Sequence, residues 1–318
     1  MPTAAFPSTR RKPPWRLTTQ RLIIVSGKGG VGKSTVAAAL ALAASRNGLR
    51  TLVVEVSGRR DVARLLEGGA AMNSQPHARP GPEHVSVERQ SALRDYLRNE
   101  VPGRLPAAML ARSKMFELFV DAAPGLGELL TIGKVCDLAG LAGGRRGDGT
   151  PDLVVLDAPS SGQLVGMLTA PRTFGSIARV GPVARQAAEV QRVLTDPTAV
   201  AAVAVATAER MAVSEALALR DRLQQELGID FAAVVVNKLL PARFSAADAA
   251  RLSVAGDDPA VRTARWFDAR ARAQRVQLAR LSKGLPGVPS ITLPFLCVDE
   301  SDRVALDRLA DAVDHLVA

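Results

Sequence analysis

The sequence is poor in cysteine and has no long hydrophobic run. Its 318 residues include two cysteines, Cys136 and Cys297, which lie far apart and form no Cys-x-x-Cys pair. A disulfide framework or a zinc ribbon requires more cysteines at closer spacing, so we exclude both. We expect a reducing, cytoplasmic compartment. The longest apolar runs, 36–44 and 199–206, fall far short of the roughly 20 residues that a membrane-spanning helix requires. At most, a peripheral contact with a membrane is expected.

Aromatic residues are also scarce. They make up 3% of the chain, which leaves few stacking platforms for single-stranded nucleic acid. Lysine and arginine outnumber aspartate and glutamate, 41 to 31, for a net charge of +10. Such an excess suits nucleic acid, an anionic membrane or phosphorylated ligands. It is spread along the chain, however, and arginine-rich codon usage explains it as well, so we do not expect nucleic acid as the main partner.

The composition is that of a folded chain, with 47% apolar and 23% charged residues. The first 20 residues hold several basic residues and prolines but no acid. They lack the apolar stretch and cleavage site of a secretory signal, so we expect residues 1–20 to form a loose basic tail. The remainder, 21–318, is long enough for one large α/β domain.

Short apolar runs alternate with helical segments over residues 21–318. The runs that resemble buried strands are 22–25, 51–56, 153–156, 200–206, 231–236 and 291–293. Uninterrupted apolar strands separated by helices, such as 208–227, indicate a parallel sheet covered on both faces. We therefore predict an α/β fold with a doubly wound, mainly parallel sheet. Three stretches around 92–138, 167–193 and 242–284 break the alternation and predict an inserted helical subdomain.

Residues 27–34 read Gly-Lys-Gly-Gly-Val-Gly-Lys-Ser and fit the P-loop motif G-x-x-x-x-G-K-[ST]. Its glycines let successive backbone N–H groups turn towards phosphate oxygens. Lys33 then neutralises phosphate charge, and the Ser34 hydroxyl ligates Mg²⁺. A helix begins near Lys33, and its positive end faces the anion. The predicted nucleotide-binding residues are Gly27, Lys28, Gly29, Gly30, Val31, Gly32, Lys33, Ser34 and Thr35.

A carboxylate ends the buried run 153–157. Asp157 is placed to order Mg²⁺ and its waters. A hydrophobic run with an aspartate is a weak signal alone, but it gains weight after a complete P-loop. We predict Ser34 and Asp157 as the magnesium ligands.

The second lysine of the loop, Lys28, is not required by an ordinary P-loop. The form GKGGVGKST resembles the deviant Walker A motif of nucleotide-switch ATPases such as the cell-division-site selection, chromosome-partition and nitrogenase iron proteins. This resemblance implies that Lys28 reaches across a dimer and stabilises phosphate charge on the partner's nucleotide. It also implies that ATP closes the dimer.

Further segments are similar to the arsenite-pump and tail-anchored-protein-targeting ATPase family. Residues 157–163 look like its switch II, 124–128 like its PGxDE helix start, 207–211 like its T-x-E strand end, and 234–241 closely match VVNQLLP. The resemblance implies that Asn237 reads adenine through its amide. It also places Pro294 at the start of the loop that packs on the base. Diverged single-domain bacterial members are the most similar.

Switch I departs from this family. Its DPAH motif supplies an aspartate that polarises the attacking water, and alignment places Ser57 there. Glu55 lies two residues earlier on the same strand face and could orient water instead. An equally open interpretation is that Glu55 caps the sheet and pairs with an arginine. Slow ATP hydrolysis, with Lys28, Lys33, Glu55 and Asp157 as the catalytic residues, is the expected activity. A non-hydrolysing ATP-dependent module is the alternative.

The resemblance also implies a partner. Arsenite requires several thiolates, which two distant cysteines do not supply. A protein client with a hydrophobic segment is expected instead, bound by a homodimer or by a heterodimer with a related ATPase. Two apolar walls could hold it: a first of Met109, Met115, Phe116, Phe119 and Val120, and a second of Met167, Leu168 and Phe174. The same residues could instead fill the protein's own core. A partition-type ATPase on DNA is a further alternative.

Overall fold

The fold is an α/β structure with one parallel sheet at its centre. The computed structural model describes residues 17–56, 60–67, 81–100, 125–142, 149–177, 181–296 and 302–317. Seven strands within these ranges pair in the order β3-β2-β4-β1-β5-β6-β7, and every pairing is parallel. They are β1 (Leu22–Gly27), β2 (Thr51–Val56), β3 (Glu83–Val87), β4 (Leu153–Ser160), β5 (Val200–Thr207), β6 (Phe231–Leu239) and β7 (Ser290–Pro294).

The strand order makes the sheet doubly wound, which confirms the predicted fold class. The chain starts in the middle at β1, builds β2, β3 and β4 on one side, and then crosses β1 to add β5, β6 and β7. Leu22 pairs with Val154 of β4 on one side and with Val200 of β5 on the other. The strand order therefore reverses at β1, and ligands of such sheets bind beyond the carboxyl ends of the strands at that point.

Strand β3 was not expected from the sequence. It lies at the edge of the sheet, and Val87 is its one buried residue. The predicted strands are apolar because both their faces are covered, as in the fully buried β1, β2 and β5. An edge strand with one exposed side lacks that signature, so its sequence resembles a loop.

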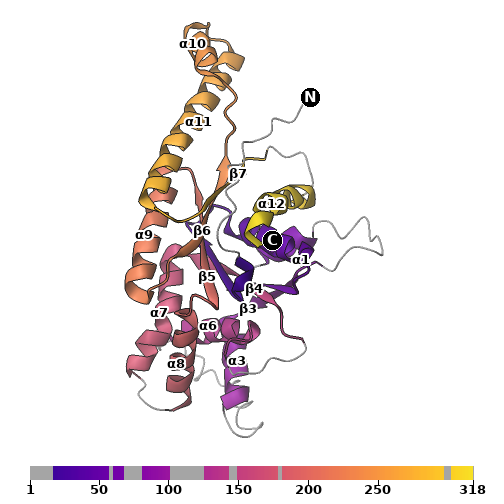
Figure 1. Ribbon diagram of the computed structural model, residues 1–318, viewed down its shortest axis with the longest axis vertical. Coiled ribbons are helices and arrows are strands. Elements are labelled where there is room, and N and C mark those ends of the chain that lie inside the picture. Colours follow the sequence, from indigo (N-terminus) through magenta and orange to yellow (C-terminus); the bar gives the residue numbers. More distant parts are fainter. Residues whose placement is uncertain are drawn as a thin grey trace, which may run out of the picture.

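Helices cover both faces of the sheet (Figure 1). On one side α1 (Lys33–Arg46) packs against α2 (Asp61–Glu67) and α12 (Asp302–Val317). On the other side α7 (Ser161–Ile177) packs against α9 (Arg210–Leu227), and α9 against α11 (Pro259–Gly284). Leu17 of the short 3-10 helix η1 (Leu17–Thr19) is fully buried beside α12, so the folded part begins before residue 21.

The segments predicted as a helical subdomain form two separate groups. At one end of the molecule α3 (Arg89–Glu100), α6 (Leu126–Leu138), α7 and α8 (Pro182–Leu194) pack together. At the opposite end α10 (Ala246–Val254) and the outer half of α11 project as an arm (Figure 1). None of the helices in the described ranges has both the length and the hydrophobicity needed to cross a membrane.

Candidate functional site

The P-loop connects the central strand to α1. β1 ends at Gly27, and α1 begins at Lys33. A Cβ atom on Gly27 would lie 2.0 Å from the carbonyl oxygen of Val205 on β5. Gly32 has a φ of 95°, in the left-handed region, and a Cβ there would lie 2.3 Å from Nδ2 of Asn237. At both positions the geometry therefore requires glycine.

The two predicted magnesium ligands lie side by side. Asp157 on β4 is buried and pairs in register with Val25 of the adjacent β1. The Ser34 hydroxyl at the start of α1 donates a hydrogen bond to Oδ2 of Asp157, at 2.7 Å. A hydroxyl and a carboxylate are the hard oxygen donors that Mg²⁺ uses together with substrate phosphates and water. The donor set therefore fits Mg²⁺ bound to a nucleotide. The part of the chain that the structure describes contains no group of three acidic, His or Cys ligands that could hold a metal without phosphate.

A cavity of about 460 Å³ opens over this loop. The P-loop and α1 form one wall and α2 forms the other; the lining residues are Gly30, Gly32, Lys33, Ser34, Thr35, Asp61, Arg64 and Leu65. Lys33 is nearly buried, and its Nζ donates a hydrogen bond to the carbonyl oxygen of Lys28, at 3.2 Å. Lys33 therefore lies within the loop itself, where a phosphate would meet both its ammonium group and the backbone amides.

Lys28 is held within its own chain. Its Nζ lies 3.1 Å from Oε2 of Glu215 on α9, and both side chains are about one-third exposed. The other oxygen of Glu215 accepts a hydrogen bond from the Ser161 hydroxyl, at the first turn of α7. The bond from Ser161, followed by that from Lys28, lowers the pKa of Glu215 below its ordinary value. The Glu215 carboxylate is therefore ionised at neutral pH, and it loses its charge as the pH falls through that lowered pKa.

Asn237 lies on the P-loop with both ends of its amide engaged. Its Nδ2 donates to the carbonyl oxygen of Val31 at 3.0 Å, and its Oδ1 accepts from the backbone N–H of Lys238 at 2.9 Å. Lys238 has a positive φ of 58°. The buried Gln274 of α11 holds this strand end by accepting from the Leu240 N–H and donating to the Lys238 carbonyl. Each end of the amide makes one of the two hydrogen bonds available to it.

Similarity to known proteins identifies the family of this chain. The model of the CobQ/CobB/MinD/ParA nucleotide binding domain, CbiA, matches residues 22–253. The chain belongs to the CbiA family. It is 31% identical over 251 residues to the ATPase BagA of Mycobacterium tuberculosis, covering 75% of this chain and 71% of BagA.

Two other relatives carry names related to the predicted family. The identity to the ATPase GET3B of Arabidopsis thaliana is 31% over 136 residues, which cover 37% of this chain and 33% of GET3B. The identity to the arsenical pump-driving ATPase of Acidiphilium multivorum is 23% over 295 residues, which cover 85% of this chain and 46% of that protein. The chain is thus a P-loop ATPase of the class that contains MinD, ParA and these relatives. Membership of the arsenite-pump branch stays a prediction.

Glu55 of this CbiA domain is engaged inside the protein. It is fully buried on β2; its Oε1 accepts the Val62 N–H at 3.0 Å, and its Oε2 lies 2.5 Å from Nε2 of His84 on β3. The partner is thus a histidine and not the arginine considered from the sequence, which did not reveal β3. Ser57 lies outside the described residues. The contacts favour a structural role for Glu55, and its catalytic role stays a prediction.

A substitution separates these two roles. Glu55→Ala removes the partner of Val62 and His84, and we expect the free energy of unfolding to fall by about 1–3 kcal/mol, the usual cost of leaving buried polar groups unpaired. Urea denaturation of the wild-type and Glu55→Ala proteins measures this difference in the free energy of unfolding. Glu67→Ala on exposed α2 surface is the control and should change stability by less than about 0.5 kcal/mol. A Glu55→Ala protein with unchanged stability would contradict the structural role.

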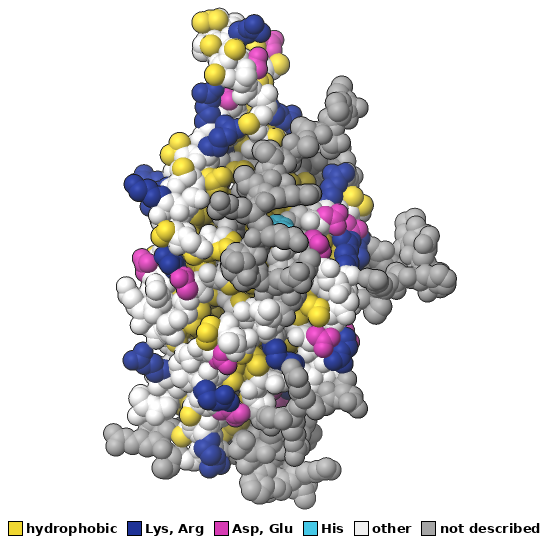
Figure 2. All heavy atoms as spheres, in the orientation of Figure 1, with side chains coloured by type: hydrophobic (Ala, Val, Ile, Leu, Met, Phe, Trp, Pro, Cys, Tyr) yellow, Lys and Arg dark blue, Asp and Glu magenta, His cyan; other side chains and the backbone are white. Residues whose placement is uncertain are grey.

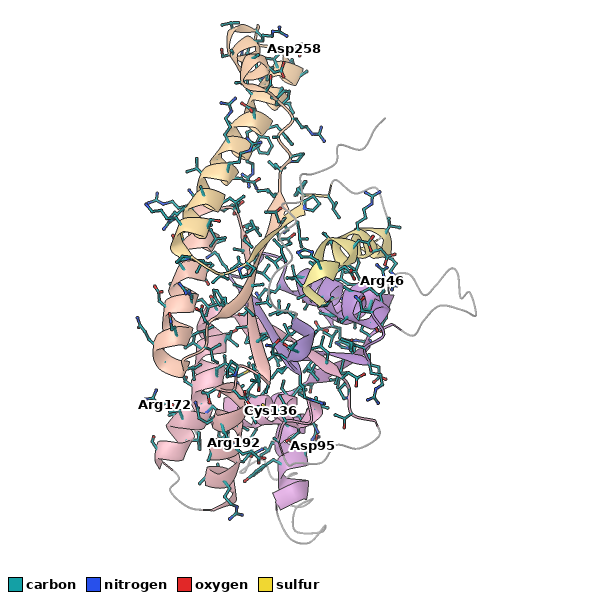
Figure 3. All side chains as sticks on the ribbon, in the orientation of Figure 1. Arg46, Asp95, Cys136, Arg172, Arg192 and Asp258 are labelled. Atoms are coloured by element: carbon teal, nitrogen blue, oxygen red, sulfur yellow. The ribbon has the colours of Figure 1, made fainter. Side chains whose placement is uncertain are left out.

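The residues proposed to line a client groove are mostly in the core or outside the described ranges. Residues 101–124, which include the first predicted wall, are not described. Met167 and Leu168 of the second wall are buried in the core, and Phe174 packs partly buried against it. For Met167 and Leu168 the structure therefore favours the core interpretation. Cys136 is likewise buried on α6 (Figure 3), and burial raises the pKa of its thiol, which keeps it from acting as a thiolate ligand.

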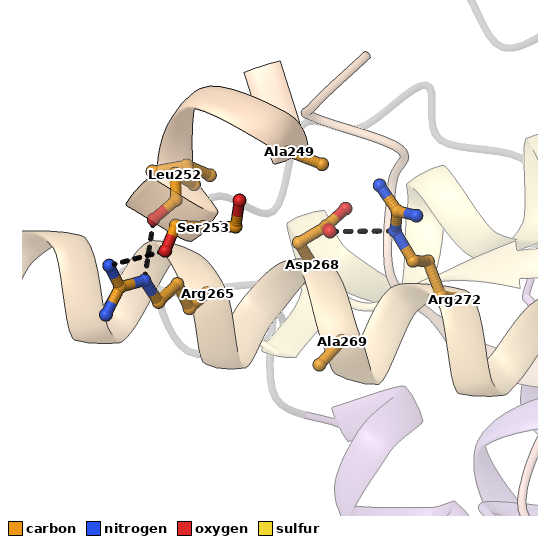
Figure 4. A pocket seen from close by; sticks show the side chains of 7 residues that line it. All are labelled: Ala249, Leu252, Ser253, Arg265, Asp268, Ala269 and Arg272. Atoms are coloured by element: carbon orange, nitrogen blue, oxygen red, sulfur yellow. Dashed lines mark hydrogen bonds and ion pairs between the residues drawn. The ribbon is translucent and has the colours of Figure 1, made fainter. Parts of the chain in front are cut away.

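A second cavity, of about 500 Å³, lies on the arm between α10 and α11 (Figure 4). Arg265 there donates hydrogen bonds to the carbonyl oxygens of Leu252 and Ser253, and Arg272 pairs with Asp268 at 2.7 Å. Basic side chains are visible over this arm in Figure 2. The cavity contains no P-loop residue and therefore is not the nucleotide site.

Proposed function

We propose that the chain is a magnesium-dependent ATPase that works as a nucleotide-gated dimer and couples its nucleotide state to binding of a protein client. The observation that carries the proposal is the position of Lys28. This lysine stands at the surface of the P-loop and is held by Glu215, which also holds Ser161. Release of this contact would free an ammonium group for a second site.

Residues of the P-loop, β4, β6 and β7 bind the magnesium nucleotide in this proposal. Lys33 neutralises phosphate charge, while Ser34 and Asp157 hold Mg²⁺, which supplies charge that offsets the negative phosphates when bound. Asn237 selects adenine through the hydrogen bonds that its amide still has available. Pro294 ends β7, paired with Leu239, and starts the segment beside the base.

Glu215 links the loop to the helices. Transfer of Lys28 to the nucleotide of a partner subunit leaves Glu215 with Ser161 alone. Ser161 begins α7, which packs against α6 and α8. A change at this residue can therefore be passed to the helical end of the molecule, where we place the hydrophobic client. The partner subunit is a second copy or a related ATPase.

The decisive experiment measures mass in solution by light scattering with ATP, with ADP and without nucleotide. We expect a dimer with ATP alone, and we expect Lys28→Ala to abolish both this dimer and most ATP turnover. Lys134→Ala is a matched control, because Lys134 is a similarly exposed lysine paired with Asp95 at 2.8 Å far from the P-loop. A monomer at saturating ATP, or a Lys28→Ala variant that dimerises and turns over normally, would show that the lysine does not act in trans.

A single-turnover assay with radiolabelled ATP distinguishes this proposal from the non-hydrolysing alternative. Labelled phosphate released by the wild-type protein supports an enzyme. Bound ATP that stays intact over hours supports a module in which the nucleotide only controls assembly.

A further inference from the structure

We propose that Asp61, the first residue of α2, orients the attacking water and so replaces the switch I aspartate for which this chain has Ser57. The inference rests on the proposed ATP hydrolysis and names the group that performs a step of it. Asp61 lines the cavity over the P-loop together with Lys33, Ser34 and Thr35.

The other carboxylates near the loop either have both oxygens bonded within the protein or are assigned to the metal. Glu55 is fully buried with both oxygens bonded to Val62 and His84. Glu215 accepts from Lys28 and Ser161 through its two oxygens, and Asp157, which accepts from Ser34, is assigned to Mg²⁺. Among the described residues that line the cavity, Asp61 is the one carboxylate. Its side chain is about half exposed, so it meets both the cavity and water.

The surrounding structure holds Asp61 in place. The next residue, Val62, is fully buried, and its N–H is bound by Glu55. Arg64 lies one turn further along and holds Oδ1 of Asp61 at 2.9 Å. α2 also packs against α1, the helix that begins at Lys33. Glu55 therefore acts on the site indirectly, as the residue that anchors the start of α2.

The chemistry requires a hydrogen-bond acceptor for water. A lone pair of the water oxygen forms the new bond to the γ-phosphorus, while the bond from that phosphorus to the bridging oxygen breaks and its electron pair stays on ADP. The Asp61 carboxylate accepts a hydrogen bond from the water and takes one proton, which then passes to the released phosphate. A carboxylate with one oxygen fixed by Arg64 keeps lone pairs free for this role.

The test is Asp61→Asn, which keeps the size of the side chain and removes its charge. We expect kcat to fall about 100-fold or more, the usual contribution of a positioned proton acceptor. KM and the affinity for a fluorescent ATP analogue should stay within about twofold. As a second readout that measures assembly and not product, the ATP-bound dimer should persist longer in light scattering, because its nucleotide is hydrolysed more slowly.

Two control variants isolate the role of Asp61. Glu67→Gln makes the same chemical change on the same helix but outside the cavity, and it should leave kcat unchanged. Arg64→Gln releases Asp61 from its ion pair while retaining the carboxylate, and we expect a loss of less than about tenfold. A loss in Arg64→Gln equal to that in Asp61→Asn would overturn the proposal, because the ion pair would then account for the effect.

The outcomes separate this inference from the proposed function. A wild-type protein that binds ATP but releases no phosphate in a single turnover would overturn both. Phosphate release by the wild type together with an unchanged kcat in Asp61→Asn would overturn this inference alone. A lost affinity for ATP in the variant would also overturn it, since Asp61 would then be a binding residue.

Discussion

Replacing Gly32 by alanine is expected to weaken ATP binding by at least about 100-fold. The residue has a φ of 95°, where a side chain costs about 1–2 kcal/mol. The new methyl group would also lie 2.3 Å from Nδ2 of Asn237. Either the loop or Asn237 must move, and a combined cost near 3 kcal/mol corresponds to about two orders of magnitude in affinity. Titration of a fluorescent ATP analogue measures the effect.

A second glycine separates loop geometry from backbone strain. Gly48, just after α1, has a φ of 91° but open space around its Cβ position. Gly48→Ala should lower the free energy of unfolding by about 1–2 kcal/mol and leave ATP affinity unchanged. If Gly32→Ala binds ATP as tightly as the Gly48→Ala protein does, the close approach between the loop and Asn237 does not shape the site.

Asp157→Asn should lower ATP turnover by about 100- to 1,000-fold. The amide keeps the shape of the side chain but removes the charge that attracts Mg²⁺, and a metal contributes several kcal/mol of charge stabilisation to phosphoryl transfer. Ser34 can still donate to the remaining oxygen, so the fold should persist. Turnover measured across a magnesium titration should show both a lower maximum and a higher magnesium requirement.

The matched control lies at the other end of the same strand. Asp152, just before β4, pairs with Arg50 at 3.0 Å, and hydrogen bonds from Arg50 lower the pKa of its carboxyl. Asp152→Asn removes an equal charge far from the P-loop and should leave turnover within about twofold of wild type. Turnover of Asp157→Asn at the level of this control would exclude Asp157 from the metal site.

The P-loop could be predicted from the sequence alone. Its glycines, Lys33 and Ser34 are contiguous, so their spacing alone predicts a strand, a loop and a helix, and the structure has all three. The pairing of Ser34 with Asp157 spans more than a hundred residues. It was nevertheless predictable, because both follow apolar strands whose carboxyl ends meet at one edge of a parallel sheet.

Glu55 and Asp61 show where sequence reasoning failed. Glu55 lies on the expected strand face, but its partner His84 comes from an edge strand without an apolar signature. Asp61 lies just after the segment aligned with the switch I motif, and nothing in its spacing separates it from other surface acids. The cavity reveals its position, because α2 and the P-loop come together only through packing against α1.

The amino-acid sequence was sufficient for the fold class, the P-loop and the likeness to ATPases, because those features depend on neighbouring residues and on the periodicity of burial. The partners of Lys28, Glu55 and Asn237 emerged only in three dimensions. These side chains contact residues from distant elements. Several polar residues could pair with each of them, and the fold decides which one comes within hydrogen-bond distance.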